Sequence, residues 1–273
     1  MIAVWDSMNE LQKPDMFLNS PFEGERGILA EIFTSFQGEG PFLGRKQIFV
    51  RTAGCNLSCS YCDTSQFRTY RVPCCRSEAK PDSGRFVEVL NPISPEAAMK
   101  LVCRLRSPGL HSVSITGGEP LCQSLFVKGL AMECAAKGLP VYLETNGFSF
   151  NRFVQLIDWI DFASVDLKLP SHRPCPAQDW NDLLKNEQTC LKAASDAGVT
   201  TIAKIVILDS TTSEEVEKAC TPLEGRDIIL VIQPATGPDR PSPGMLAHFH
   251  QKASAHMKDV VVIPQTHKIM GVL

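Results

Sequence analysis

The chain has 273 residues, of which 44% are hydrophobic and 21% are charged, and its formal net charge is −3. This length and composition are typical of one large or two small globular domains, and without a basic run they disfavour a nucleic-acid backbone as the main partner. Since neither a secretory leader nor an apolar run near the roughly 20 residues of a membrane span is found, we expect a cytoplasmic protein without a membrane partner.

The first predicted elements are an N-terminal extension and two strands. Residues 1–26 form the extension, and the strands are predicted at 28–34 (ILAEIFT) and 47–52 (QIFVRT). The connection between the strands includes GEGPFLG and is too short for a helical crossover. We therefore expect the first strand to be an antiparallel edge strand.

Three cysteines follow the second strand directly, in the segment GCNLSCSYC. Cys55, Cys59 and Cys62 are separated by gaps of three and then two residues. An iron–sulfur cube normally takes four thiolates, so three would leave one iron open to a small molecule. A zinc site and unliganded thiols are the alternatives, but structural zinc favours a second spaced pair, and Cys74–Cys75 is a poor match. Eleven cysteines, an odd number with irregular spacing, also disfavour a disulfide framework.

Residues 65–93 are a long polar stretch after the cysteines. The stretch is too long to be a simple connection, so we interpret it as an insertion that forms a lid or stays disordered. Its role, and that of Cys74 and Cys75 within it, is left open.

Strands alternate with helices over the rest of the chain. Further strands are predicted at 111–116, 141–145, 162–168, 201–208, 228–233 and 259–263. Helices are predicted from Ser94 onward and at about 122–137, 150–159, 177–197, 212–222 and 243–256. Nearly continuous apolar strands that alternate with helices predict a parallel sheet with right-handed crossovers. Because six strand–helix units are too few for a closed eight-unit barrel, we favour an α/β fold built as a partial, open parallel (β/α)6 barrel over a doubly wound sheet.

Polar and glycine-rich groups follow five of the predicted strands. They are the cysteine triplet, Gly117–Gly118–Glu119–Pro120, Glu144–Gly147, Asp166 with Lys168, and Gln233–Pro234. Folds of this kind place their sites at the carboxyl ends of parallel strands. The sequence therefore predicts one site along this edge of the sheet.

The cysteine triplet and its neighbouring segments resemble a known family. The spacing C-x3-C-x2-C after a first strand is the signature of radical S-adenosylmethionine (SAM) enzymes. Residues 31–64, with QGEG ahead of the cysteines, closely resemble the 7-carboxy-7-deazaguanine synthases, and SITGGEP, SVDLKLPS and VIPQTHK resemble later segments of that family. The resemblance covers about residues 28–64, 111–171 and 228–270. It implies one radical SAM catalytic domain over 27–273, with the insertion at about 65–93.

The resemblance also implies a reaction and its cofactors. The expected enzyme is a carbon–nitrogen lyase that converts 6-carboxy-5,6,7,8-tetrahydropterin to 7-carboxy-7-deazaguanine with loss of ammonia, on the route to queuosine and related 7-deazapurines. The implied cofactors are a 4Fe-4S cluster on Cys55, Cys59 and Cys62, SAM at the open iron, and Mg²⁺. The SAM-derived radical would carry the chemistry, so no side chain is assigned as catalytic.

The family pattern assigns SAM contacts to residues around the cluster and at later strand ends. They are Tyr61, Cys62, Asp63, Gly118, Asp166, Leu167, Lys168 and Gln233. From the residues alone, the two glycines could equally form an ordinary tight turn. Asp166 or Lys168 could equally belong to a structural ion pair.

The pattern assigns the pterin and the metal to residues nearer the N-terminus. The substrate contacts are Phe36, Gln37, Gly38, Arg51 and Thr116, and Thr64 is the Mg²⁺ ligand. Arg51 lies in an apolar strand, where an unpaired guanidinium is costly. Its partner could be a structural carboxylate such as Glu31 or Glu39, or the substrate carboxylate, and the resemblance favours the substrate. Spacing alone would make Thr64 no more than a turn cap.

Two other functions are alternatives to this reading. A glycyl-radical-enzyme activase is the nearest enzymatic alternative, and a non-enzymatic iron–sulfur or zinc module is a less favoured one. A flavodoxin-like electron donor and a homodimer are implied by the resemblance alone. The six histidines show no metal-ligand spacing, so we expect them at the surface or in the core. The same expectation holds for the cysteines on predicted helices, which are Cys103, Cys122, Cys134, Cys190 and Cys220.

Overall fold

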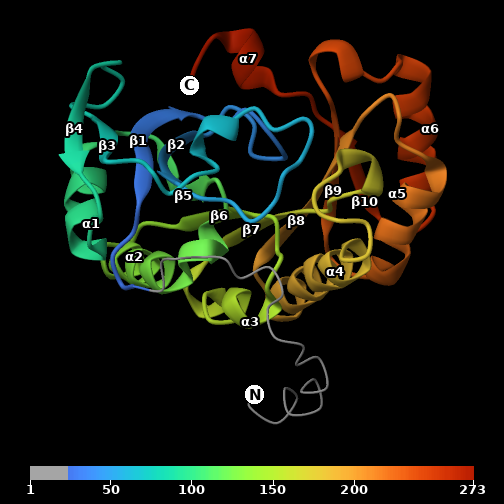
Figure 1. The fold of residues 1–273 in the computed structure, drawn as a ribbon, viewed down its shortest axis with the longest axis horizontal. Helices are drawn as coiled ribbons and strands as arrows, with labels where there is room; N and C mark the ends of the chain where they lie inside the picture. The colour runs from blue at the N-terminus through green and yellow to red at the C-terminus, as the bar shows by residue number, and fades with distance from the viewer. Residues whose placement is uncertain (1–23) are drawn as a thin grey trace.

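The computed structural model describes residues 24–273, so most of the predicted N-terminal extension, residues 1–23, lies outside the described part. The centre of the fold is a ten-stranded sheet with the strand order β10-β9-β8-β7-β6-β5-β2-β1-β3-β4 (Figure 1). The strands are β1 (Leu29–Phe36), β2 (Lys46–Thr52), β3 (Cys74–Glu78), β4 (Phe86–Leu90), β5 (Leu110–Gly117), β6 (Val141–Thr145), β7 (Phe162–Asp166), β8 (Thr200–Ile207), β9 (Ile229–Pro234) and β10 (Asp259–Val262).

Seven neighbouring strands of this sheet are parallel, namely β2 and β5 to β10. Helices connect them one after another, as the alternating pattern predicts. The helices are α1 (Pro95–Arg104), α2 (Ser124–Ala136), α3 (Phe150–Phe153), α4 (Trp180–Asp196), α5 (Ser213–Cys220), α6 (Pro243–Ser254) and α7 (Thr266–Met270). Because β4 and β10 are the two ends of the sheet and do not pair with each other, the predicted open, partial barrel is confirmed.

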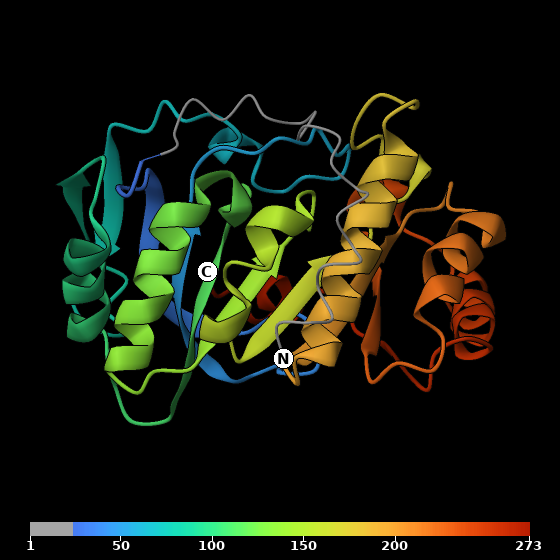
Figure 2. The ribbon, with the colours of Figure 1, turned by 90° about the horizontal axis from the view of Figure 1, so that it is seen from below.

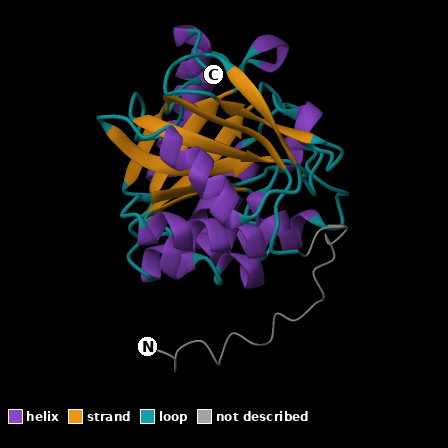
Figure 3. Ribbon diagram, turned by 90° about the vertical axis from the view of Figure 1, so that its left-hand side faces the viewer, coloured by secondary structure: helices purple, strands orange, loops and turns teal. Residues whose placement is uncertain are grey.

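The helices divide between the two sides of the sheet. Figure 2 shows α1 to α6 in a row over one side. In Figures 1 and 3, α7 lies on the opposite side, close to where the chain ends. α7 therefore lies over the side of the sheet that helices α1 to α6 leave uncovered (Figures 1 and 2).

Local sequence signals explain where several helices begin. The Ser94 hydroxyl accepts a hydrogen bond from the Ala97 amide at 3.3 Å, and Pro95 takes the first helical position of α1, as predicted. Thr212 and Glu215 form a capping box at the start of α5. The helix predicted at 150–159 is wrong in length, because α3 ends at Phe153 and a separate 3-10 turn covers Ile157–Trp159.

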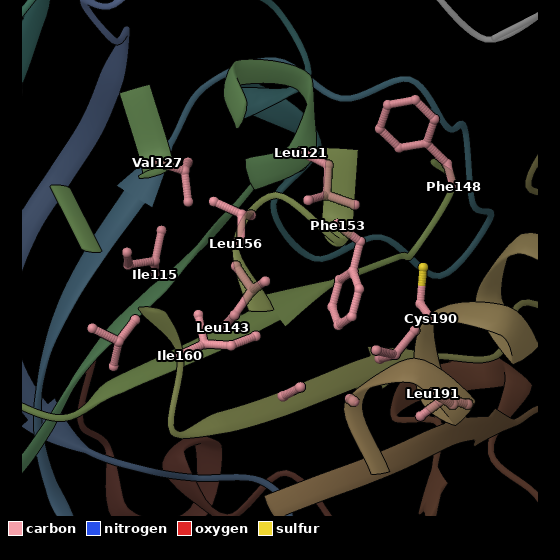
Figure 4. Close-up of a cluster of buried hydrophobic side chains, with 14 of the residues drawn as sticks. Ile115, Leu121, Val127, Leu143, Phe148, Phe153, Leu156, Ile160, Cys190 and Leu191 are labelled. Carbon is pink, nitrogen blue, oxygen red and sulfur yellow. The ribbon is translucent and has the colours of Figure 1, made fainter. Parts of the chain in front are cut away.

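The hydrophobic core lies between the sheet and helices α2 to α4. Figure 4 shows Ile115 and Leu143 from the strands facing Val127, Phe153 and Leu191 from the helical side. All five side chains are buried. Each buried side chain of this size contributes about 1.5–3 kcal/mol relative to an exposed one, so this layer fixes the positions of the strand ends.

The structure differs from the prediction in two features of the N-terminal side of the sheet, the position of β1 and the structure of residues 65–93. β1 is antiparallel to β2, as predicted, but it is not an edge strand, because β3 pairs with its other side and β4 lies beyond β3. The stretch at 65–93 is not simply a lid or a disordered insertion, since residues 74–90 form a β-hairpin. Cys75 and Ser77 of β3 are buried, and the turn places Asp82 and Gly84 at positive φ. The strands were missed because both are only five residues long, and β3 (CCRSE) ends in three consecutive polar residues, so it has neither an apolar run nor an alternating pattern.

The loop between β1 and β2 fills the inside of the barrel below the strand ends. The ring of Phe42 lies 5.0 Å from that of His111, 5.9 Å from that of Tyr142 and 4.8 Å from that of Phe162. Edge-to-face aromatic contacts of this kind are favourable beyond the area that they bury. One loop therefore packs Phe42 into the barrel and also carries Gln37 to the carboxyl ends of the parallel strands.

Within residues 24–273, no helix combines the length and the apolar character that a membrane span requires.

Candidate active site

A cavity of about 700 Å³ opens where the parallel strands end. It is lined by nearly all the residues that the sequence predicted for the site, namely Phe36, Gln37, Gly38, Arg51, Cys55, Cys59, Tyr61, Cys62, Asp63, Thr64, Thr116, Gly118, Asp166, Lys168 and Gln233. Leu167 is the exception in this set, because its side chain is only 1% exposed and packs into the hydrophobic core. The predicted convergence of strand ends on one site is therefore what the structure contains.

The cysteine loop is anchored on both sides. The Ser58 amide donates to the Pro174 carbonyl at 2.8 Å, and the Ser60 amide donates to the His172 carbonyl at 2.9 Å. On the other side, the Arg68 guanidinium donates to the carbonyl of Cys59 at 2.6 Å. The loop that carries the thiols is thus held by its backbone, which leaves the sulfur atoms free for a ligand.

The thiols of Cys55, Cys59 and Cys62 are not in disulfides. Burial, together with the charge of Glu119, raises the pKa of the Cys55 thiol to about 12. Burial also raises the pKa of the Cys59 thiol. Because a thiol must lose its proton before it binds iron, loading a metal cluster here releases protons.

The three thiols suit a multi-iron cluster better than a single metal ion. Among residues 24–273, no three His, Cys, Asp or Glu side chains are placed to hold one ion. A cube binds each thiolate through a different iron atom, so its three sulfur ligands need not converge on one point. The geometry therefore fits the predicted 4Fe-4S cluster and disfavours the zinc alternative.

Two glycines bring the end of β5 against the cysteine loop. Gly117 has a φ of +130°, and a Cβ on Gly118 would lie 2.1 Å from the carbonyl oxygen of Gly54. The Glu119 amide donates to that same carbonyl at 2.8 Å. Glycine is required here because backbone atoms cannot move aside for a side chain. The glycine pair is therefore required for the packing of this turn against the cysteine loop.

Glu119 is a buried carboxylate that ties β5 to β6. It accepts hydrogen bonds from the Thr145 hydroxyl at 2.5 Å, the Asn146 amide at 2.7 Å and the Leu121 amide at 2.8 Å. Burial raises the pKa of Glu119 to about 7, and these hydrogen bonds limit the rise. Since Glu119 lines the cavity, a cationic group bound beside it would favour the ionised form.

Lys168 and Lys204 flank Asp166 at the end of β7. The Lys168 ammonium donates to Asp166 at 2.6 Å and to the Tyr61 hydroxyl at 2.9 Å, while Lys204 lies 3.1 Å from Asp166 and 2.8 Å from Glu39. Burial alone would raise the pKa of Asp166, but the two lysines lower it to about 2. The structural ion pair considered for these residues is therefore present, and it lies in the cavity wall.

Trp180 supports this strand end from behind. Its indole N–H donates to the carbonyl of Lys168 at 2.7 Å, and the ammonium of Lys218 lies 4.5 Å from its ring centroid. The Trp180 side chain is buried. The backbone that presents Asp166 and Lys168 to the cavity is therefore fixed by a packed aromatic residue.

Arg51 has the predicted carboxylate neighbour, but the contact is long. Its Nε lies 3.4 Å from Glu31 Oε2 and has no hydrogen-bond acceptor within the part of the chain that the structure describes. The guanidinium also lies 5.7 Å from the ring centroid of Phe33. Glu39, the other predicted structural partner, pairs with Lys204 instead. Arg51 lines the cavity, and its Nε–H is available to donate a hydrogen bond to a ligand.

Gln37 belongs to a buried hydrogen-bond network. Its amide nitrogen donates to Glu144 at 2.8 Å and to Gln47 at 3.1 Å. The Thr116 hydroxyl donates to the other oxygen of Glu144 at 2.8 Å. Three predicted or suspected site residues, Gln37, Thr116 and Glu144, thus form one polar wall of the cavity.

The last residues of the chain form a further wall of the cavity that was not predicted from the sequence. The Thr266 amide donates to the Gly38 carbonyl at 2.9 Å, and Gln265 donates to Glu39 at 2.8 Å and to Asp63 at 3.1 Å. His267 is half-buried and lines the cavity, a position that the sequence did not predict for any of the six histidines. VIPQTHK gave only a weak signal, because the position of His267 depends on contacts distant in sequence.

Lys204 was also missed, although the sequence contained a signal for it. It is the one charged residue in the apolar strand TIAKIVIL, and it lies in the cavity wall. The argument that was applied to Arg51, that a buried cation needs a partner, would have selected it as well.

Comparisons with known proteins agree with this geometry. The family described as the radical SAM superfamily matches residues 49–221. A 7-carboxy-7-deazaguanine synthase from Thermococcus kodakarensis is 37% identical over 91% of this chain and 100% of its own length. One from Methanocaldococcus jannaschii is 35% identical over 90% of this chain and 100% of its own length. The crystal structure of QueE from Escherichia coli matches with a TM-score of 0.55 and 18% identity, over 94% of this chain and 100% of that one.

Proposed function

The chain belongs to the radical SAM superfamily and, within it, to the 7-carboxy-7-deazaguanine synthases, and on that premise we propose that its cavity converts 6-carboxy-5,6,7,8-tetrahydropterin to 7-carboxy-7-deazaguanine. The reaction releases ammonia, which makes the enzyme a carbon–nitrogen lyase. Its product would enter the route to queuosine and other 7-deazapurines.

One observation carries the proposal. A single cavity contains both the three free thiols and an arginine whose buried Nε lacks a hydrogen-bond acceptor among residues 24–273. The thiols suit a cluster that binds SAM, and a guanidinium with donors in reserve suits a carboxylate substrate. The unused N–H donor of Arg51 therefore favours an enzyme with a small acidic substrate over a cluster-binding protein without one.

The residues assigned to the cofactors are those of the strand ends. Cys55, Cys59 and Cys62 would hold the 4Fe-4S cluster. The SAM contacts would be Tyr61, Cys62, Asp63, Gly118, Asp166, Lys168 and Gln233, together with the backbone of Leu167. When bound and reduced, the cluster and SAM supply the radical that takes a hydrogen atom from the substrate. Gln233 supports this assignment, because its buried Oε1 has no hydrogen-bond partner in the described part of the chain.

The remaining residues would bind and orient the pterin. Arg51 would pair with its carboxylate, and Phe36, Gln37, Gly38 and Thr116 would contact its ring. Gln37 is held by Glu144, so its orientation is fixed before the substrate arrives. Such preorganisation lets a protein hold a reactive atom in place without spending binding energy on ordering side chains.

Thr64 would provide a protein oxygen for Mg²⁺. Its hydroxyl lies 3.9 Å from the sulfur of Cys62, next to the proposed cluster. Magnesium prefers oxygen ligands and often shares those of its substrate. Thr64 would therefore hold the ion beside the cysteine loop, where its charge would stabilise negative charge on the substrate.

The proposal extends to organisation and partners. Residues 27–273 would form one catalytic domain, because a single sheet runs from β1 to β10. A homodimer and a flavodoxin-like electron donor are expected for the family. Analytical ultracentrifugation and reduction by a purified flavodoxin test these two points separately.

Turnover after anaerobic reconstitution tests the proposed reaction. The protein, loaded with iron and sulfide and given SAM, Mg²⁺ and 6-carboxytetrahydropterin, should form 7-carboxy-7-deazaguanine. Cys59→Ala should lose both the iron–sulfur absorbance and the product. Cys103→Ala, which alters an exposed cysteine of α1, should keep both. Product formation by Cys59→Ala would refute the role of Cys59, and wild-type protein that loads a cluster but forms no product would refute the reaction.

A further inference from the structure

A row of side chains crosses the sheet from the cavity to its far edge. The strand registers place Thr116 of β5, Arg51 of β2, Glu31 of β1, Arg76 of β3 and Glu88 of β4 next to one another. These five strands lie side by side in Figure 1. Directly paired residues on neighbouring strands project from the same face of a sheet. Four charges of alternating sign, Arg51, Glu31, Arg76 and Glu88, therefore form what we call the charge row.

The contacts within the charge row are unequal. Arg76 Nη1 donates a hydrogen bond to Glu31 Oε1 at 3.0 Å. The other oxygen of Glu31 lies 3.4 Å from Arg51 Nε, which has no hydrogen-bond acceptor within residues 24–273. Glu31 thus directs its hydrogen bond outward, away from the cavity, and keeps only a long ionic contact with Arg51.

The chain holds Arg76 in the position that this contact needs. Its guanidinium lies 4.6 Å from the ring centroid of Phe86, the first residue of β4. A cation over an aromatic face is attracted to it and loses some of its freedom. The Arg76 side chain is 56% exposed, whereas that of Glu31 is 11% exposed. The hairpin of β3 and β4 therefore places the positive charge of Arg76 next to the nearly buried carboxylate of Glu31.

We propose that Arg76 is a positioning residue for the substrate, because its bond to Glu31 keeps the Arg51 guanidinium available to the pterin carboxylate. The inference rests on the proposed role of Arg51. Without Arg76, Glu31 would have Arg51 as its remaining cationic neighbour in the row and would compete with the substrate for it. Neither Glu31 nor Arg76 lines the cavity. The hairpin would thus support substrate binding from outside the site.

Binding of two pterins that differ in one group tests this proposal. The probes are 6-carboxypterin and pterin, which lacks the carboxylate, titrated into the anaerobically reconstituted enzyme with SAM. Arg76→Ala should weaken the binding of 6-carboxypterin about fivefold, which corresponds to about 1 kcal/mol, and leave that of pterin unchanged. Arg76→Lys should restore most of the loss because it returns the charge. Arg85→Ala removes a positive charge from the same hairpin outside the row, and it should bind both probes like the wild type.

The outcomes separate this inference from the proposed function. If Arg51→Ala loses 6-carboxypterin binding and Arg76→Ala does not, the positioning role is overturned and the role of Arg51 stands. If Arg76→Ala and Arg85→Ala weaken binding equally, the effect is one of overall charge and the inference is also overturned. If Arg51→Ala binds 6-carboxypterin like the wild type, the proposed substrate site itself fails. Arg76→Gln, which keeps the stem over Phe86, replaces Arg76→Ala if that variant does not fold.

Discussion

Glu187 of α4 is a carboxylic acid that the fold encloses completely. Its side chain has no exposed surface, and one of its oxygens accepts the Lys168 amide at 3.0 Å. The other oxygen has no hydrogen-bond partner among the described residues. Burial, together with the charges of Asp166 and Glu119, raises the pKa of Glu187 well above its ordinary value, although Lys168 opposes the shift. The fold therefore favours the neutral, protonated form of this group.

The neutral acid makes stability depend on pH with a definite sign. Its contribution to the free energy of unfolding is complete below the ordinary glutamate pKa of 4.5. It is lost as the pH rises from there through the raised pKa of the folded state, because the unfolded chain releases the proton more easily. Glu187→Gln keeps an acceptor for Lys168 and cannot ionise, so it should be more stable than the wild type in mildly alkaline buffer.

Urea unfolding of the cluster-free protein, in acidic and in mildly alkaline buffer, measures this effect. The advantage of Glu187→Gln over the wild type should grow as the pH rises. Glu214→Gln is the control, because it removes a carboxylate at an exposed position of α5. A difference between Glu187→Gln and the wild type that stays constant with pH would show that Glu187 ionises normally.

Gly118 shows how a single missing side chain decides the site. A Cβ at this position would collide with the backbone of Gly54, just ahead of Cys55. Gly118→Ala should push the cysteine loop away from β5, so the purified protein should bind less iron and less SAM. Iron content after reconstitution and a SAM titration are the measurements.

Gly244→Ala is the matched control for that substitution. A Cβ on Gly244 of α6 would come no closer than 3.9 Å to a neighbouring atom, Ser242 Oγ. Alanine also favours helix over glycine by about 1 kcal/mol. This variant should keep full iron loading, and equal loading by Gly118→Ala would mean that the cysteine loop tolerates the shift.

At the scale of elements, the loop between β1 and β2 has two separable tasks. Its first residues present Gln37 and Gly38 to the cavity, and Phe42 packs inside the barrel. Phe42→Ala should lower the free energy of unfolding by about 2–3 kcal/mol, below the ~3–5 kcal/mol of a fully buried phenylalanine, because Phe42 is partly exposed. Pterin binding should change little, since Gln37 keeps its bonds to Glu144 and Gln47.

Denaturant unfolding and a pterin titration separate the two tasks. Leu43→Ala alters the neighbouring residue, whose side chain is 43% exposed, and should cost much less stability. Loss of pterin binding in Phe42→Ala at temperatures where the variant is folded would show instead that the loop acts as one rigid unit.

The elements that could be predicted from the sequence differ in a physical property from those that could not. The strands at 201–208 and 228–233 were predicted because their long apolar runs record burial on both faces, which is a local property of the sequence. The hairpin of β3 and β4 and the short helix α7 were not, since they are short and their positions depend on distant partners. The same contrast holds in the site. The cysteine triplet and the glycine pair are legible in the sequence, whereas His267 reaches the cavity only because its ring packs against Gly38.

At the scale of the whole molecule, the open sheet predicts a gradient of stability. β5 pairs with a strand on each side, whereas β4 has a partner on one side within the described sheet. The residues of β4 are also more exposed. Amides of β4 should therefore exchange with solvent faster than those of β5, by on the order of 100-fold. Hydrogen exchange read by mass spectrometry on peptides from the two strands tests this, and equal rates would indicate that another chain covers β4.

Trp180 gives the molecule an optical reporter of its own. It is one of three tryptophans, and its indole N–H is bonded to the carbonyl of Lys168, in the wall where we place SAM. A ligand that interacts with Lys168 should change the electric field around the Trp180 indole and therefore shift the wavelength of its fluorescence emission. The binding of SAM to the oxygen-sensitive protein can therefore be followed by tryptophan fluorescence in a sealed cuvette, before any turnover takes place.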